Sequence, residues 1–245
     1  MLGIVAGALL PATALGTTAS YSPSGGLLIE GDAAGETLRV QVLDESFRVI
    51  RDDGPGVVAG SGCVAVSASA TIVQCLVSVQ GPLSRSVTAR LGDGADDLSF
   101  IINPGAAPVP ATIDGGGGGD TLTSGLRAGP NGGGAGEPPL AAVNAAAHTI
   151  IGGEGDDLFL GDSGGTDVIL GGPGDDTLRA RASARSTDTF IGGAGTDVAD
   201  YSARLDAVRL TTSNTATLPD DGAPGEGDDI GRAETLIGGP GPDTL

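Results

Sequence analysis

The chain has 245 residues with a formal net charge of −19, and its 45 glycines far outnumber its six aromatic residues. So much negative charge excludes nucleic acid as a partner, because phosphate binding needs a basic surface. The same charge repels itself in any compact state, and few aromatic side chains are present to fill a broad core. We therefore expect a narrow core of stacked aliphatic side chains, together with bound cations that relieve the repulsion.

The N-terminal residues MLGIVAGALLPATALGTTAS have the features of a secretion signal. Leu2 to Leu10 form an apolar segment that is too short to span a membrane and is followed by Pro11. Small residues favour cleavage after Ala14 or after Ala19. The sequence predicts a signal peptide over residues 1–19 and a secreted, extracellular protein with no membrane span.

Residues 20–110 are predicted to form an N-terminal β region. Short runs rich in Val and Ile, each typical of a strand, are LLIEG, TLRVQVL, FRVIRD, TIVQCLVSV and SVTARL. The only cysteines, Cys63 and Cys75, lie in this region. In an exported chain the pair predicts a disulfide, and the alternative is two unpaired buried thiols.

A unit of about nine residues recurs along the chain, in which glycines precede an Asp and an apolar residue follows two positions later. The clearest copy is GGEGDDLFL, Gly152 to Leu160. Five units cover residues 152–200, and their acidic residues are Asp157, Asp167, Asp176, Asp188 and Asp197. Outlying units contain Asp96 in residues 91–99, Asp120 in residues 115–123 and Asp243 in residues 238–245, and a weaker one over residues 31–39 has Glu36 at the Asp position.

Each position of the unit suits a calcium-binding turn. Glycine adopts positive φ angles, which lets a turn curl tightly and direct its carbonyl oxygens inward. Calcium takes about six to eight oxygen ligands from carbonyls and carboxylates, and Asp is short enough to reach back to its own turn. The apolar residue at the eighth position is predicted to point inward, as Phe159, Ile169, Leu178 and Phe190 would, whereas Ala199 fills that position poorly.

The pattern GGxGxDxUx resembles the RTX, or haemolysin-type calcium-binding, repeat family. The resemblance implies an all-β fold, a right-handed parallel β-roll (a β-helix-like solenoid) over residues 111–245, following the N-terminal β region. In that family one coil takes two units, so turns two units apart share an edge. This implies Asp157, Asp176 and Asp197 on one edge, Asp167 and Asp188 on the other, and Ca²⁺ between successive turns.

Two segments interrupt the repeats and are predicted to be loop insertions, residues 124–142 and 201–235. A short strand is predicted at residues 207–212 within the second. Acidic residues outside the register are predicted to be solvated, namely Asp220, Asp221, Glu226, Asp228 and Asp229 in the second insertion, and Asp156 and Asp175 at the fifth position of their units.

Residues 143–151 read as a degenerate unit with His148 at the Asp position and Ile150 pointing inward. A neutral imidazole there predicts a coil that binds no calcium. A transition-metal site at His148 is the alternative, but no partner residues accompany it.

The segment GDSGG, Gly161 to Gly165, also matches the nucleophile motif of trypsin-like proteases. His148, the only histidine, lies just 15 residues before Ser163, whereas that family takes its catalytic residues from well-separated segments. The nine-residue register accounts for GDSGG without catalysis. An EF-hand is disfavoured because the chain has no Asp-x-Asp-x-Asp-Gly loop.

We therefore expect a secreted, non-enzymatic protein that binds calcium ions and whose folding is coupled to calcium, because carboxylates from successive coils come together only on folding. The alternative is a calcium-dependent folding or secretion module of a larger exported enzyme, toxin or adhesin. A protein or surface partner is not indicated by the sequence.

Overall fold

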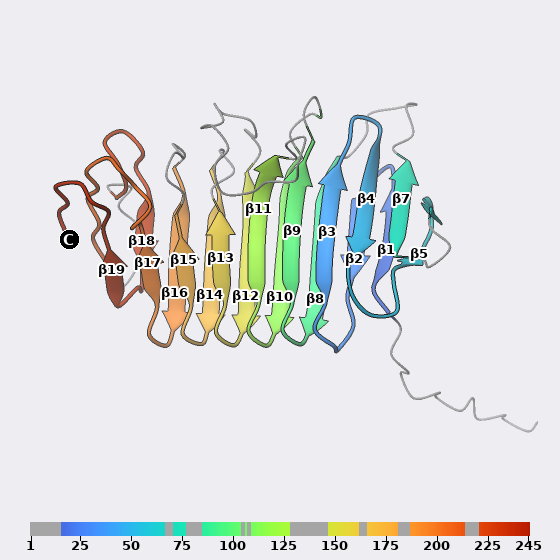
Figure 1. Cartoon of the computed structure of the whole chain (residues 1–245), viewed down its shortest axis with the longest axis horizontal. Helices are drawn as coiled ribbons and strands as arrows, with labels where there is room; N and C mark the ends of the chain where they lie inside the picture. The colour runs from blue at the N-terminus through green and yellow to red at the C-terminus, as the bar shows by residue number, and fades with distance from the viewer. Residues whose placement is uncertain are drawn as a thin grey trace, which may run out of the picture.

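Two β-sheets make up the structure, a computed structural model that describes residues 16–66, 71–76, 85–103, 106, 109–127, 147–161, 166–180, 187–213 and 221–245 (Figure 1). No helix occurs within those ranges. The first sheet contains, in spatial order, β18 (Asp229–Gly231), β16 (Thr189–Ala194), β14 (Val168–Pro173), β12 (His148–Glu154), β10 (Ala111–Gly117), β8 (Val87–Asp93), β2 (Gly26–Glu30), β1 (Thr18–Ser22) and β5 (Val58–Ala59). The second contains β19 (Thr235–Ile237), β17 (Val198–Asp200), β15 (Thr177–Arg179), β13 (Leu158–Gly161), β11 (Thr121–Arg127), β9 (Asp97–Ile102), β3 (Thr37–Val42), β4 (Ser46–Arg51), β7 (Ile72–Leu76) and β6 (Cys63–Ala65).

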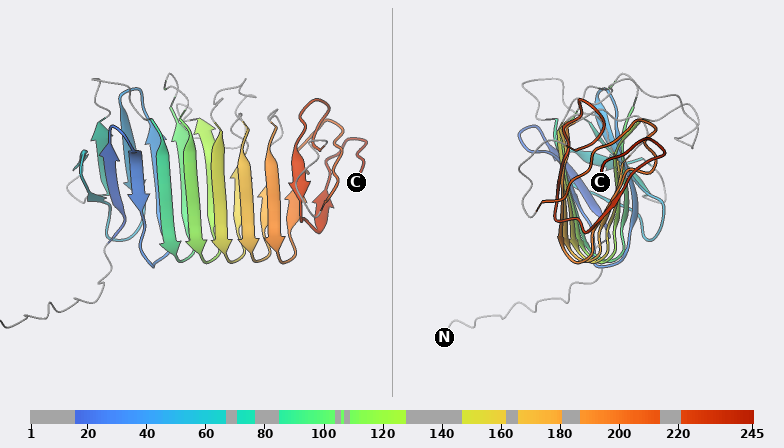
Figure 2. Two further views of the ribbon diagram at one scale, coloured as in Figure 1. Left: turned by 180° about the vertical axis from the view of Figure 1, so that it is seen from behind. Right: turned by 90° about the vertical axis from the view of Figure 1, so that its left-hand side faces the viewer.

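From β8 onward the chain alternates between the sheets, placing one strand in each. We call such a pair, joined by a tight turn, a rung. Each strand pairs in parallel with the corresponding strand of the next rung, as β12 does with β14 and β13 with β15. Seen along the stack, the two sheets face each other and are joined along one edge by the tight turns (Figure 2). The prediction of an all-β protein with parallel strands is confirmed.

The core lies between the sheets and follows the repeat. In the first sheet Ile150, Ile169 and Phe190 stand in register, and in the second Phe159, Leu178 and Ala199 do. All six are buried, so the inward direction predicted for the eighth position is confirmed. The rings of Phe159 and Phe190 meet edge to face at 6.2 Å between centroids, a favourable aromatic geometry.

Antiparallel strands extend the stack at its N-terminal end. Strand β1 pairs antiparallel with β2, and β4 lies antiparallel between β3 and β7. The strand-like runs predicted for this region correspond to β2, β3, β4, β7 and β8, with residues 77–79 outside the described ranges. The sheets continue without a break past residue 110, because β8 pairs with β10 and β9 with β11.

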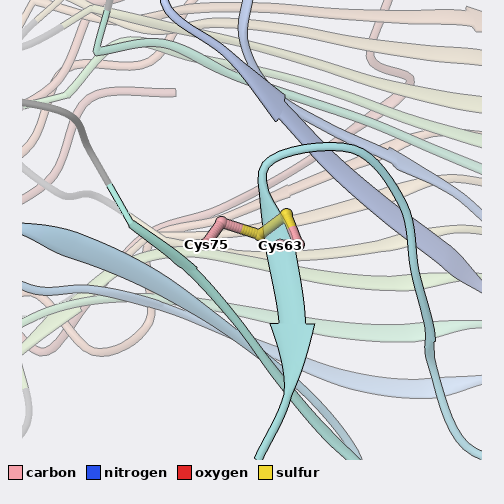
Figure 3. Close-up of a disulfide and its surroundings, with 2 residues drawn as sticks. All are labelled: Cys63 and Cys75. Carbon is pink, nitrogen blue, oxygen red and sulfur yellow. A yellow bond between two sulfur atoms is a disulfide. The ribbon is translucent and has the colours of Figure 1, made fainter.

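The predicted disulfide is present. Cys63 and Cys75 face each other on β6 and β7, with an S–S distance of 2.02 Å (Figure 3). The pair therefore links β6, at the end of the second sheet, to its neighbour.

Both predicted loop insertions differ from the structure. Strand β11 continues to Arg127, so residues 124–127 are strand, and residues 128–142 lie outside the described ranges. Residues 207–212 do not form the predicted strand; within them only Arg209 makes isolated bridges, with Gly222 and Thr244. Within the predicted loop 201–235, β18 and the start of β19 belong to a further rung. Residues 1–15 of the predicted signal peptide, residues 1–19, lie outside the described ranges, as does Ser163. The last two residues of that segment, 18 and 19, belong to β1.

Candidate metal site

The turns that lead from the first sheet to the second, apart from the one between β5 and β6, each end in an acidic residue, and these residues stack in a line. This first row consists of Glu36, Asp96, Asp120, Asp157, Asp176, Asp197 and Glu234. The backbone N–H of each member donates to a side-chain oxygen of the next member, at 2.7–3.0 Å. The predicted ligands Asp157, Asp176 and Asp197 thus lie on one edge, together with Asp96 and Asp120.

The second carboxylate oxygen of these residues has no such donor. Among the described residues, six of these oxygens are buried without a hydrogen-bond partner. They are Oε2 of Glu36 and Oδ2 of Asp96, Asp120, Asp157, Asp176 and Asp197. The aspartates are at most 3% exposed. Because a buried charge without a partner is costly, the row has an unmet need for protons or cations.

In most turns of the first row, a glycine five residues before the acidic residue leaves room for these oxygens. The exception among the row aspartates is Asp96, where Leu91 stands at this position. At Gly152 an added Cβ would overlap Oδ2 of Asp157 and lie 2.7 Å from the carbonyl oxygen of Gly171. Oxygens from two successive turns therefore converge on this glycine. Gly153 and Gly155 are needed for a different reason, since their φ angles are 118° and 126°. The predicted role of glycine in positive-φ turns is correct for these two, whereas Gly152 provides space.

The electrostatics of the first row are dominated by burial. Desolvation raises the pKa of Asp96 and of Asp157 to about 7 and that of Asp176 to about 6. The nearby charges that act on Asp157 belong to Asp120, Asp176 and Asp156, and each raises its pKa further. Two like charges about 4.8 Å apart, the spacing of neighbouring strands, repel by about 3 kcal/mol at an effective dielectric constant of ~20. This repulsion exceeds the roughly 1 kcal/mol that a hydrogen bond supplies.

A second row lies where the strands of the first sheet begin, at the opposite edge. It consists of His148, Asp167, Asp188 and Asp228, joined by the same amide-to-carboxylate hydrogen bonds at 2.9–3.0 Å. The predicted stacking of Asp167 on Asp188, and the placement of His148 at an Asp position, agree with this arrangement. A cavity of about 20 Å³, room for about one water molecule, adjoins the three aspartates.

Unlike the aspartates of the first row, two carboxylates of the second row have side-chain partners. The ring Nδ1 of His148 lies 3.0 Å from Oδ1 of Asp167. The hydroxyl of Tyr201 donates to Oδ2 of Asp228 at 2.8 Å. Next to them Arg204 forms a buried ion pair with Glu226 at 2.6 Å.

Some acidic residues lie where the sequence did not place them. Asp221, Glu226 and Asp228 are buried, so the prediction that they are solvated is wrong; Asp220 is outside the described ranges. Asp156 and Asp175 are exposed as predicted. Asp243, a predicted ligand, belongs to neither row by its hydrogen bonds, because its Oδ1 accepts from the amide of Val208 at 2.9 Å.

Two row members were missed because their glycines are displaced or absent. Asp228 and Ile230 keep the Asp-x-apolar spacing, although the preceding glycines are shifted by one position. Glu234 and Leu236 keep the same spacing without the glycines. The acidic-x-apolar spacing alone would have found both.

Within the described ranges no three His, Cys, Asp or Glu side chains converge on a common point. The carboxylates stand in single file, one per turn. A cation between two turns would therefore take carboxylate oxygens from both and complete its shell with backbone carbonyls. An all-oxygen donor set of this kind suits a hard cation such as calcium.

Comparison of the chain with profiles of protein families, with curated proteins and with solved structures found no significant match.

Proposed function

We propose that this chain is a secreted, non-enzymatic protein that binds Ca²⁺ along its first row, with folding coupled to calcium. The proposal depends chiefly on the buried carboxylate oxygens of the first row, which have no hydrogen-bond donor among the described residues. A divalent cation neutralises two neighbouring carboxylates at once. Calcium is preferred to magnesium because it accepts several carbonyl oxygens in irregular geometry, whereas Mg²⁺ demands a near-octahedral shell and retains water.

The proposed ligands are Asp96, Asp120, Asp157, Asp176 and Asp197. We assign weaker calcium binding to Asp167 and Asp188. The carboxylates of the second row already lie near the side chains of His148, Tyr201 and Arg204. Asp243 is retained as a weak candidate, since Gly238 leaves room for its Oδ2 as Gly152 does for that of Asp157. The fold proposed for the rungs is a right-handed parallel β-roll, as in the RTX-type repeats that the sequence resembles.

Secretion is supported by the disulfide between Cys63 and Cys75, a bond that persists in oxidising compartments. Within the described ranges no helix is long and apolar enough to cross a membrane. Thr17 and Ala19 are completely buried, and the carbonyl of Thr17 accepts from the amide of Val58. If a signal peptide is removed, these contacts favour cleavage after Ala14, because cleavage after Ala19 would remove part of β1.

Calcium titration followed by circular dichroism and by calorimetry tests the proposal. We expect dissociation constants of about 10⁻⁴–10⁻³ M, as in other extracellular calcium modules. Calcium at about one hundred times the dissociation constant would stabilise the folded state by about 2.7 kcal/mol per site. Magnesium at the same concentration is the control. Identical spectra and melting temperatures in chelator and in calcium would refute calcium binding by this chain.

The alternative, a calcium-dependent module of a larger exported enzyme, toxin or adhesin, uses the same ligands. Calcium binding supports both readings, so a catalytic or adhesive activity of the complete protein is what separates them.

A further inference from the structure

Two arginines are buried in the described part of the chain, and each lies at an end of one row. Arg51, on β4, is 3% exposed and contacts Glu36, the first member of the first row. Arg204 is 4% exposed and pairs with Glu226, two residues before Asp228 at the last position of the second row. An arginine is always charged, so its burial requires acidic partners.

Arg51 brings a positive charge into contact with the carboxylate at the end of the first row. Its Nη1 lies 3.0 Å from Oε1 of Glu36, 2.8 Å from Oγ1 of Thr17 and 3.5 Å from Oδ2 of Asp32. Its Nε lies 3.2 Å from Oδ1 of Asp53. One guanidinium therefore bridges three carboxylates and supplies one positive charge among them.

One carboxylate oxygen of Glu36 has three hydrogen-bond donors. Its Oε1 accepts from Thr17, from the amide of Asp32 and from Arg51, all at 2.8–3.0 Å. Asp157, in the middle of the row, has one amide donor on Oδ1. The second oxygen of each residue, Oε2 of Glu36 and Oδ2 of Asp157, has no hydrogen-bond partner. Among the described residues, Glu36 therefore has a positive side chain in contact with its carboxylate, whereas Asp157 has none.

We infer that Arg51 is a built-in counter-ion that closes the first row, so that calcium binding begins at Asp96 and excludes Glu36. This inference rests on the proposed calcium function. It assigns Arg51 the role of setting how many ions the row takes. A guanidinium at this end would also repel any cation approaching Asp32 and Glu36.

The stoichiometry of calcium binding, measured by calorimetry on the full chain, tests the assignment. Glu36→Gln should bind the same number of ions as the wild type, because Glu36 is not a ligand. Arg51→Gln should bind one more ion, since Glu36 and Asp32 are freed. Arg39→Gln is the control, because Arg39 pairs with Asp52 on the surface and should leave the number unchanged.

Loss of one ion in Glu36→Gln, or an unchanged number in folded Arg51→Gln, would overturn the assignment. If Arg51→Gln does not fold, Glu36→Gln decides alone. A wild-type chain that binds no calcium would instead refute the proposed function itself, so the two failures are distinguishable.

Discussion

The two edges of the stack carry rows with the same hydrogen-bond pattern but different surroundings. From β8 onward every turn on the edge of the first row has three residues, such as Gly155 to Asp157 between β12 and β13. On the edge of the second row, six residues separate β13 from β14, whereas 28 separate β17 from β18. A constant turn length keeps the acidic residues of the first row at one height and in contact, rung after rung.

The variable edge has room for other chemistry at the same positions. His148 replaces one carboxylate, Tyr201 donates to another, and Arg204 lies nearby. The same acidic position therefore keeps a buried oxygen without a hydrogen-bond partner on one edge, whereas it contacts a histidine or tyrosine side chain on the other. The environment of the Asp decides its role, and the motif alone does not.

The largest expected difference between the edges concerns the aspartates themselves. Asp157→Asn should lower calcium affinity by roughly tenfold, because affinity follows the number of charged ligands, whereas Asp167→Asn should change it by less than about threefold. In metal-free buffer Asp157→Asn should raise the melting temperature, since it removes a charge that faces other carboxylates. Calorimetric titration and thermal unfolding of both variants measure these effects.

Asp156→Asn is the matched control for this comparison, because Asp156 is adjacent but exposed. Equal losses of affinity in Asp157→Asn and Asp167→Asn would show that the two edges do not differ in calcium binding.

A separate effect, on stability, is expected from the glycine that makes room for the row. Gly152→Ala should destabilise the protein by about 2 kcal/mol, the usual scale of overpacking, because the new methyl would overlap Oδ2 of Asp157. Gly117→Ala should stay within about 0.5 kcal/mol, since its nearest neighbour is at an ordinary 3.4 Å. Denaturant unfolding in calcium gives both values, and similar losses at the two glycines would contradict the role of Gly152. The second row differs at this position, because the residue five before Asp228 is Ala223, whereas the residue five before Asp157 is Gly152.

A third effect is expected on the pH dependence of stability in the absence of metal. The folded-state pKa values of Asp96 and Asp157 are about 7, against an ordinary 3.8. The folded state therefore holds more protons than the unfolded state between these values, and stability is lost as pH rises from about 4 to about 7. We expect the melting temperature in metal-free buffer to fall by several degrees between pH 5 and pH 8, and calcium to remove this fall. A rise over the same range in metal-free buffer would contradict the raised pKa values.

The nine-residue register predicted much of the fold and of the site because both depend on local repetition. It placed Phe159 and Leu178 inward and put Asp157 next to Asp176, which lies 19 residues away. It could not predict the contact of Arg51 with Glu36, since this depends on the antiparallel pairing of β3 with β4 outside the repeat. It also could not separate Asp157 from Asp167, because both occupy the same position in their units.

The hydrogen bonds of the first row all run in one direction, from the amide of one turn to the carboxylate of the next. Each complete rung contributes one donor and one acceptor. A duplicated rung inserted anywhere between Asp120 and Asp197 would therefore leave no bond of the ladder unmatched. The length of such a protein can grow or shrink by whole copies of a short gene segment, whereas a partial copy would break the alignment of every turn on that edge.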